Sequence, residues 1–137
     1  MISQLQCQKA VILIVDDQMT NILLLENILQ AAGYTNVHST TDSTEVVKLF
    51  REINPDLICL DIRMPEVDGF QVMGQLKIVN KRTFLPILVL TSEEDRGTRL
   101  RALESGAKDF LNKPFDKVEV LMRIRNLLET GLLHKAN

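Results

Sequence analysis

The most informative stretch of this chain reads Leu57-Ile58-Cys59-Leu60-Asp61. Its first four residues form a continuous apolar run, which is typical of a strand buried on both faces of a parallel sheet. The run ends on a carboxylate, a group that is expensive to bury without a partner. The stretch therefore predicts a buried strand whose last residue, at the carboxyl end of the sheet, takes part in the chemistry of a site.

Working outward, five short apolar runs alternate with five segments of helical spacing. The runs cover residues 10–15, 36–39, 57–61, 87–91 and 109–111. Gly33 and Gly106 stand where helices are expected to end, and the last helix is expected at residues 116–133. Asp42 and Asp116 each precede a glutamate by three residues and predict capping boxes. Alternating strands and helices imply right-handed βαβ units, so we expect an α/β fold with one doubly wound, five-stranded parallel sheet and helices on both faces.

Composition fits a single soluble domain. The chain has 137 residues, 45% of them hydrophobic and 25% charged, with a net charge of −2. This balance argues against direct nucleic-acid binding, and the apolar runs are too short to span a membrane. Cys7 and Cys59 do not form a disulfide framework, so we expect a cytoplasmic protein. We divide it into an N-terminal extension (1–8), one domain (9–129) and a C-terminal helix extension or start of a connector (130–137).

Polar residues follow four of the five predicted strands. They are Asp16 and Asp17, Asp61, Thr91 and Ser92, and Lys113 with Pro114. In open α/β sheets, ligands bind outside the carboxyl ends of the strands, so these side chains are expected to converge. Two carboxylates about 5 Å apart repel by roughly 3 kcal/mol at an effective dielectric of about 20, which favours recruitment of a cation.

The residue types indicate phosphoryl chemistry. Oxygen ligands in a small site favour a hard ion, above all Mg²⁺. Asp61 is the natural nucleophile, since a carboxylate can attack phosphorus to form an acyl phosphate. Lys113 offers a point charge for a phosphate, and the hydroxyl of Thr91 can donate to a phosphoryl oxygen.

Four stretches together resemble the signature sequences of bacterial response-regulator receiver domains. They are Val15-Asp16-Asp17, residues 60–69 (LDIRMPEVDG), Leu90-Thr91-Ser92 and residues 109–115 (DFLNKPF). The resemblance extends over residues 9–128. It implies a flavodoxin-like fold with strand order 2-1-3-4-5.

The resemblance also implies a role for each matching residue. Asp61 is the expected phosphoacceptor. Asp17, Asp61 and the backbone carbonyl of Arg63 are the expected direct ligands of Mg²⁺ (or Mn²⁺), and Asp16 is expected to act through a metal-bound water. Lys113 is the expected partner of the phosphoryl group, and its bond to Pro114 is expected to be cis.

Thr91 and Phe110 are the expected switch residues: Thr91 contacts the phosphoryl group and Phe110 turns inward as Thr91 moves. Phe110 stands where the family often has Tyr, and Ser92 where it has a smaller residue. Arg63, Ser92 and Glu93 lie where the family varies and tunes phosphoryl lifetime. Arg63 and Glu93 either pair across the site or are both solvated surface residues.

The implied function is that of a signalling receiver rather than an enzyme of external substrates. A sensor histidine kinase or a histidine phosphotransfer protein would donate the phosphoryl group, and self-hydrolysis would reset the protein. We expect the helix that begins near Gly97 to shift on phosphorylation. Its surface, with the fifth strand and last helix, carries Arg99, Lys108 and Phe110 and is the expected contact for a partner, including a homodimer. An effector domain could follow the last helix.

Three other functions are compatible with parts of this sequence. A flavin carrier would need a phosphate-binding loop where Asp16 and Asp17 stand. A phosphatase with an aspartyl nucleophile would need turnover on external esters, and the chain has no substrate-covering insertion. An interaction domain without chemistry would not need the acids, Thr91 and Lys113 together.

Overall fold

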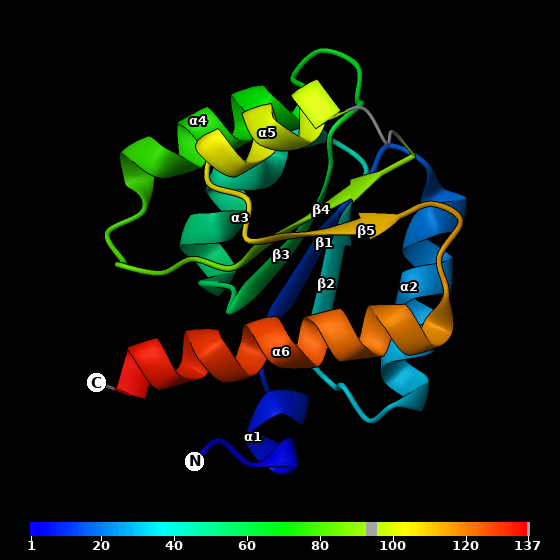
Figure 1. Cartoon of the computed structure of the whole chain (residues 1–137), viewed down its shortest axis with the longest axis vertical. Helices are drawn as coiled ribbons and strands as arrows, with labels where there is room; N and C mark the ends of the chain where they lie inside the picture. The colour runs from blue at the N-terminus through cyan, green and yellow to red at the C-terminus, as the bar shows by residue number, and fades with distance from the viewer. Residues whose placement is uncertain (93–95, 137) are drawn as a thin grey trace.

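The structure is a computed structural model that describes residues 1–92 and 96–136. Its five strands form one parallel sheet in the order β2-β1-β3-β4-β5 (Figure 1), which confirms the predicted fold. The strands are β1 (Ile12–Val15), β2 (Val37–Thr40), β3 (Leu57–Asp61), β4 (Ile87–Thr91) and β5 (Asp109–Asn112).

Helices cover both faces of the sheet, as predicted. The helices are α1 (Gln4–Gln8), α2 (Met19–Ala31), α3 (Val46–Ile53), α4 (Gly69–Val79), α5 (Arg96–Glu104) and α6 (Lys117–Ala136), with a 3-10 turn at Ser43–Glu45. Ile12 and Ile14 of β1 face a core shared with α2 and α6, whereas Leu13 and Val15 face a second core shared with α3 and α4. This alternation places the helices in two layers (Figure 1).

Two of the continuous apolar runs predicted the strand boundaries to the residue, and the third did not. β3 and β4 have the predicted limits, and every residue in them is buried. β1 begins at Ile12 rather than at residue 10, because the backbone N–H of Val11 donates to Oδ2 of Asp56 at 2.8 Å. The backbone N–H of Val11 therefore donates to a side chain, and pairing with the neighbouring strands begins at Ile12.

Local capping differs from the predicted capping boxes. Asp42 accepts a hydrogen bond from the backbone N–H of Thr44, but Glu45 accepts one from the hydroxyl of Thr40 instead of returning to Asp42. At the start of α6, Asp116 caps the backbone N–H of Glu119 at 2.9 Å, while the Glu119 side chain pairs with Arg123. Both aspartates therefore cap, without the reciprocal half of a capping box.

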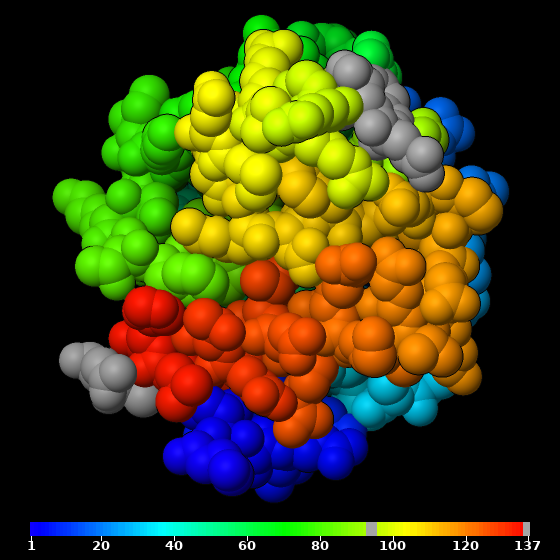
Figure 2. Space-filling view, in the orientation of Figure 1, coloured from blue at the N-terminus to red at the C-terminus, as the bar shows by residue number. Residues whose placement is uncertain are grey.

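The N-terminal segment forms a helix that the sequence analysis did not predict. Ser3 and Gln6 make a capping box at the start of α1, and Cys7 is fully buried in the core. The space-filling view shows this segment in contact with the band formed by α6 (Figure 2). The segment is therefore packed against the domain.

The last turns of α6 also pack on the domain, although we expected them to extend beyond it. The ammonium of Lys135 lies 3.4 Å from Oδ1 of Asp56, and the ring of His134 stacks on Phe84 with centroids 4.7 Å apart. Gly131 permits this approach, because a Cβ there would lie 2.8 Å from Cγ of Pro86. None of the helices in the described part of the chain has the length and apolar character of a membrane span.

Candidate phosphoryl site

The predicted site residues gather at one edge of the sheet. Parallel strands bring their carboxyl ends together, so the residues after β1, β3, β4 and β5 meet there. A small cavity of about 200 Å³ at this edge is lined by Asp17, Gln18, Asp61, Arg63, Thr91, Ser92 and Lys113. The convergence that the sequence predicted is therefore present.

Asp16 forms the floor of the site. It is completely buried, and its Oδ2 lies 3.0 Å from the ammonium of Lys113. Its Oδ1 accepts hydrogen bonds from the backbone N–H of Gln18 at 2.9 Å and from the side-chain amide of Asn21 at 3.3 Å. A buried carboxylate is tolerated when it is paired and hydrogen-bonded, and both conditions hold here.

Asp61 shares the ammonium of Lys113 with Asp16. The distance from Nζ to Oδ1 of Asp61 is 3.2 Å, and the backbone N–H of Arg63 donates to the same oxygen at 3.3 Å. Only 4% of Asp61 is exposed. Burial, and after it the charge of Asp16, raise the pKa of Asp61 to about 7, although Lys113 opposes this shift.

The pKa of Lys113 is also raised, which favours the charged form of a lysine. Burial alone would lower its pKa, but the hydrogen bonds and charges of Asp16 and Asp61 outweigh burial, and the pKa of Lys113 is raised. The ammonium therefore keeps its charge at neutral pH. Lys113 contacts two of the three clustered carboxylates, and one ammonium does not balance three such charges. The cluster therefore keeps excess negative charge, which is the condition that attracts a metal ion.

Asp16, Asp17 and Asp61 fit a divalent ion. Each offers one oxygen, and these three atoms lie within 4.8 Å of one another. All donors are hard carboxylate oxygens, as Mg²⁺ and Mn²⁺ prefer, and Asp17 is half-buried at the mouth of the site.

A glycine at the start of α4 shapes the loop after β3. The backbone N–H of Gly69 donates to the carbonyl of Ile62 at 2.8 Å. A Cβ at Gly69 would lie 2.6 Å from the carbonyl oxygen of Asp61 and 2.7 Å from Cα of Ile62. Only glycine lets this helix pass so close to the backbone of the expected phosphoacceptor.

The remaining predicted residues surround the carboxylates. Thr91 is buried at the end of β4, and Ser92 is exposed beside it. The Lys113–Pro114 peptide bond is cis. The two alternatives for Arg63 and Glu93, a pair across the site or two solvated residues, lie outside what the structure describes, because Glu93 is not among the described residues.

Phe110 is half-buried on β5 under an arginine of α5. The guanidinium carbon of Arg99 lies 5.0 Å from the centroid of the Phe110 ring, and Nη2 of Arg99 donates to Oδ1 of Asn112 at 2.8 Å. Arg99 therefore connects α5 to the end of β5.

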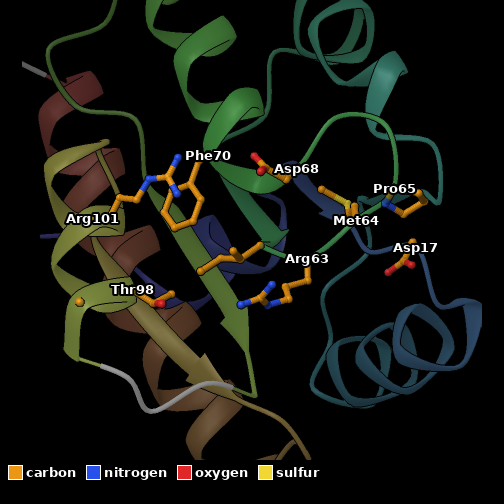
Figure 3. Close-up of a pocket in the computed structure, with 10 residues that line it drawn as sticks. Asp17, Arg63, Met64, Pro65, Asp68, Phe70, Thr98 and Arg101 are labelled. Atoms are coloured by element: carbon orange, nitrogen blue, oxygen red, sulfur yellow. The ribbon is translucent and has the colours of Figure 1, made fainter.

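A larger cavity of about 580 Å³ opens next to the carboxylates, between the loop after β3 and α5. Asp17 and Arg63 belong to both cavities. Figure 3 shows Asp17 on one side and Arg101 on the other, where its guanidinium carbon lies 3.9 Å from the centroid of the Phe70 ring. The two cavities thus join the carboxylates to the surface of α5.

Sequence reasoning did not identify two residues that shape the site, Asn21 and Gly69. Gly69 follows Asp68 in a matched stretch, and Asp68 with Gln71 forms a capping box that could have signalled the helix start. No such signal marks Asn21, because its contact with Asp16 depends on the orientation of the first turn of α2 relative to the loop after β1.

The chain belongs to the response regulator receiver domain family, whose model matches residues 12–125. It is 41% identical over 122 residues to the response regulator PleD of Caulobacter vibrioides, an alignment that covers 89% of this chain and 27% of PleD. It is 37% identical over 117 residues to the alkaline phosphatase synthesis transcriptional regulatory protein PhoP of Bacillus subtilis, covering 85% of this chain and 48% of PhoP. The chain thus spans between about a quarter and a half of these relatives.

Solved structures support the same assignment. The chemotaxis protein CheY4 of Vibrio cholerae matches with a TM-score of 0.81 at 28% identity, over 87% of this chain and 98% of that one. A two-component response regulator/GGDEF domain protein matches with a TM-score of 0.82 at 29% identity, over 90% of this chain and 51% of that one. The fold therefore occurs both as a nearly complete chain and as part of a longer one.

Proposed function

We propose that this chain is the phosphorylation-driven switch of a two-component phosphorelay, with Asp61 as phosphoacceptor. The phosphoryl donor is a phosphohistidine on a sensor histidine kinase or a histidine phosphotransfer protein. The observation that carries the proposal is the cluster of three carboxylates, of which Asp16 and Asp61 both contact the ammonium of Lys113. Family membership gives this cluster its chemical context.

In the proposed transfer, a carboxylate oxygen of Asp61 attacks phosphorus. The new bond is an acyl phosphate, the bond from phosphorus to the histidine nitrogen breaks, and the imidazole keeps that electron pair and takes up a proton. Water later attacks phosphorus, and the bond to Asp61 breaks with release of inorganic phosphate. The chain promotes both steps on itself, so it is a receiver rather than an enzyme with an external substrate.

Asp17, Asp61 and the backbone carbonyl of Arg63 would hold Mg²⁺ or Mn²⁺ directly, with Asp16 acting through a water. When bound, the ion supplies neutralisation of the charge on the carboxylates and the phosphoryl oxygens. Lys113 contributes a second positive charge already in place. Positioning and charge neutralisation account for most of the catalysis expected in such a transfer.

The proposed switch runs from the site to the α5 surface. Thr91 moves toward the phosphoryl group, Phe110 turns inward, and the start of α5 near Gly97 shifts. Ser92, Arg63 and Glu93 tune the lifetime of the acyl phosphate. The supporting observation is local: Thr91 ends β4, and Phe110 lies on the adjacent strand β5.

The output surface is proposed at α5, β5 and α6, and includes Arg99 of α5, Phe110 of β5 and Lys108 just before β5. It would contact a partner, a second copy of the chain or an effector domain. The proposed boundaries are a receiver domain at residues 9–129, an N-terminal extension (1–8) and a C-terminal helix extension or start of a connector (130–137). We further propose a cytoplasmic location, since the phosphodonors act there.

Labelling with a small acyl phosphate tests the function. Wild-type protein with acetyl phosphate and Mg²⁺ is expected to gain the mass of one phosphoryl group, and the gain should be lost with EDTA. Asp61→Asn should gain nothing, whereas Asp68→Asn should still be labelled, because Asp68 is a half-buried capping residue outside the carboxylate cluster. Equal labelling of Asp61→Asn would refute the assignment.

A further inference from the structure

Asn21 stands out among the residues around Asp16. It lies in the first turn of α2, is half-buried, and places its amide nitrogen 3.3 Å from Oδ1 of Asp16. It belongs to none of the stretches that carry the family resemblance. Its contact is nevertheless with the most deeply buried carboxylate of the site.

The orientation of the Asp16 carboxylate needs fixing. The terminal torsion of an aspartate is broad and defines no single plane by itself. Lys113 contacts Oδ2, and the backbone N–H of Gln18 contacts Oδ1. Asn21 gives Oδ1 a second donor from a different element, so that the carboxylate is held together from the loop after β5, the loop after β1 and α2.

We propose that Asn21 is a positioning residue, which holds Asp16 in the orientation required for divalent-ion binding. This inference rests on the proposed function. Outer groups that hydrogen-bond to the groups around a metal orient them and tune affinity. An amide suits this role because it donates without adding charge, whereas a lysine would cancel negative charge that attracts the ion, and a leucine of similar size could not donate.

Asn27 supplies a matched control. It lies further along the same helix and is exposed, so replacing it changes the same chemistry away from the site. The comparison of Asn21→Leu with Asn27→Leu therefore separates the contact with Asp16 from general effects on α2. Thermal unfolding in EDTA shows whether both variants fold, and Asn21→Ala replaces Asn21→Leu if the larger side chain unfolds the protein.

Magnesium titration of the metal-free protein by calorimetry gives the first readout. We expect Asn21→Leu to raise the dissociation constant for Mg²⁺ at least about tenfold. This is the range typical of losing a hydrogen bond to a group that surrounds a metal ion. Asn27→Leu should stay within about twofold of wild type, which is the ordinary scatter for a surface substitution. In NMR spectra of wild type, Mg²⁺ should shift the side-chain amide signals of Asn21 and leave those of Asn27 in place.

The second readout is the dependence of acetyl-phosphate labelling on Mg²⁺ concentration. Asn21→Leu should need roughly tenfold more Mg²⁺ for half-maximal labelling, while the maximal rate at saturating Mg²⁺ recovers. Equal Mg²⁺ affinities for Asn21→Leu and Asn27→Leu would overturn this inference alone. A loss of maximal rate without a change in Mg²⁺ dependence would overturn it as well. A wild-type protein that binds no Mg²⁺ would overturn the proposed function and this inference together.

Discussion

Nζ of Lys113 lies 3.2 Å from Oδ1 of Asp61, and both side chains are largely withdrawn from solvent. The same ammonium lies 3.0 Å from Asp16, so one cation balances two buried carboxylates. Removing one partner of a buried ion pair leaves an uncompensated charge, which costs more than the pair contributes. Lys113 is therefore expected to matter for stability as well as for chemistry.

Lys113→Ala should destabilise the metal-free protein by about 2–4 kcal/mol at pH 8, because Asp16 and Asp61 then face each other without the ammonium. Mg²⁺ should restore part of this loss. Urea unfolding with and without Mg²⁺ measures both effects, and Lys117→Ala, an exposed lysine at the start of α6, is the control. Unchanged stability of Lys113→Ala in EDTA would count against the ion-pair geometry.

The raised pKa of Asp61 predicts a pH dependence of stability. Between about pH 4, where the unfolded carboxyl ionises, and about pH 7, the folded protein keeps a proton that the unfolded chain has released. The free energy of unfolding should therefore fall as pH rises through this window, by about 1–3 kcal/mol after allowance for solvent screening, and level off above it.

Asp61→Asn isolates this contribution. The difference in unfolding free energy between wild type and Asp61→Asn, measured in EDTA, should grow in favour of the variant from pH 4 to pH 7. Saturating Mg²⁺ should reduce the difference, because a bound cation stabilises the ionised carboxylate. A difference that does not vary with pH would mean that Asp61 ionises normally in the folded protein.

Two glycines of α4 should respond in opposite directions to alanine. A Cβ at Gly69 would lie 2.6 Å from the carbonyl oxygen of Asp61, whereas a Cβ at Gly74 meets nothing within 4 Å. Gly69→Ala is expected to cost about 1–3 kcal/mol through overpacking and to slow labelling of Asp61. Gly74→Ala should stabilise by up to about 1 kcal/mol, since alanine favours the helix. Thermal denaturation that ranks the two variants the other way would contradict this geometry.

The stacking of Arg99 on Phe110 should favour the half-exposed position of that ring. A cation–π contact at a partly exposed site is worth about 0.5–1 kcal/mol. If phosphorylation turns Phe110 inward, Arg99→Ala should raise the affinity for beryllofluoride in the presence of Mg²⁺ by about two- to fivefold. Calorimetry measures this shift, with Arg96→Ala as an exposed control on the same helix. Weaker binding by Arg99→Ala would show that Arg99 supports the phosphorylated form.

The sequence predicted those parts of the fold that depend on local pattern. β3 and β4 could be bounded to the residue from their apolar runs, whereas the equally apolar run at residues 10–15 began two residues before β1. The carboxylates could be grouped because parallel strands end at one edge. α1 was not predicted, although Ser3 and Gln6 have the spacing of a capping box, because a helix of five residues also requires the packing of Cys7.

Long-range side-chain contacts could not be predicted from the sequence for a different reason. The contact of Lys135 with Asp56 joins residues 79 positions apart, and nothing local to either one marks the other as its partner. The hydrogen bond from Asn21 to Asp16 is closer in sequence, yet it depends on the orientation of the first turn of α2. Such contacts follow from packing geometry, which periodicity does not specify.

The most direct measurement of the central claim is anomalous diffraction from a crystal soaked in Mn²⁺ at neutral pH. We predict one strong peak within bonding distance of carboxylate oxygens of Asp17 and Asp61, next to the buried Asp16. An acidic pocket without a peak at saturating Mn²⁺, with the Asp61 side chain turned away from Asp17, would contradict a metal-assisted phosphoryl site.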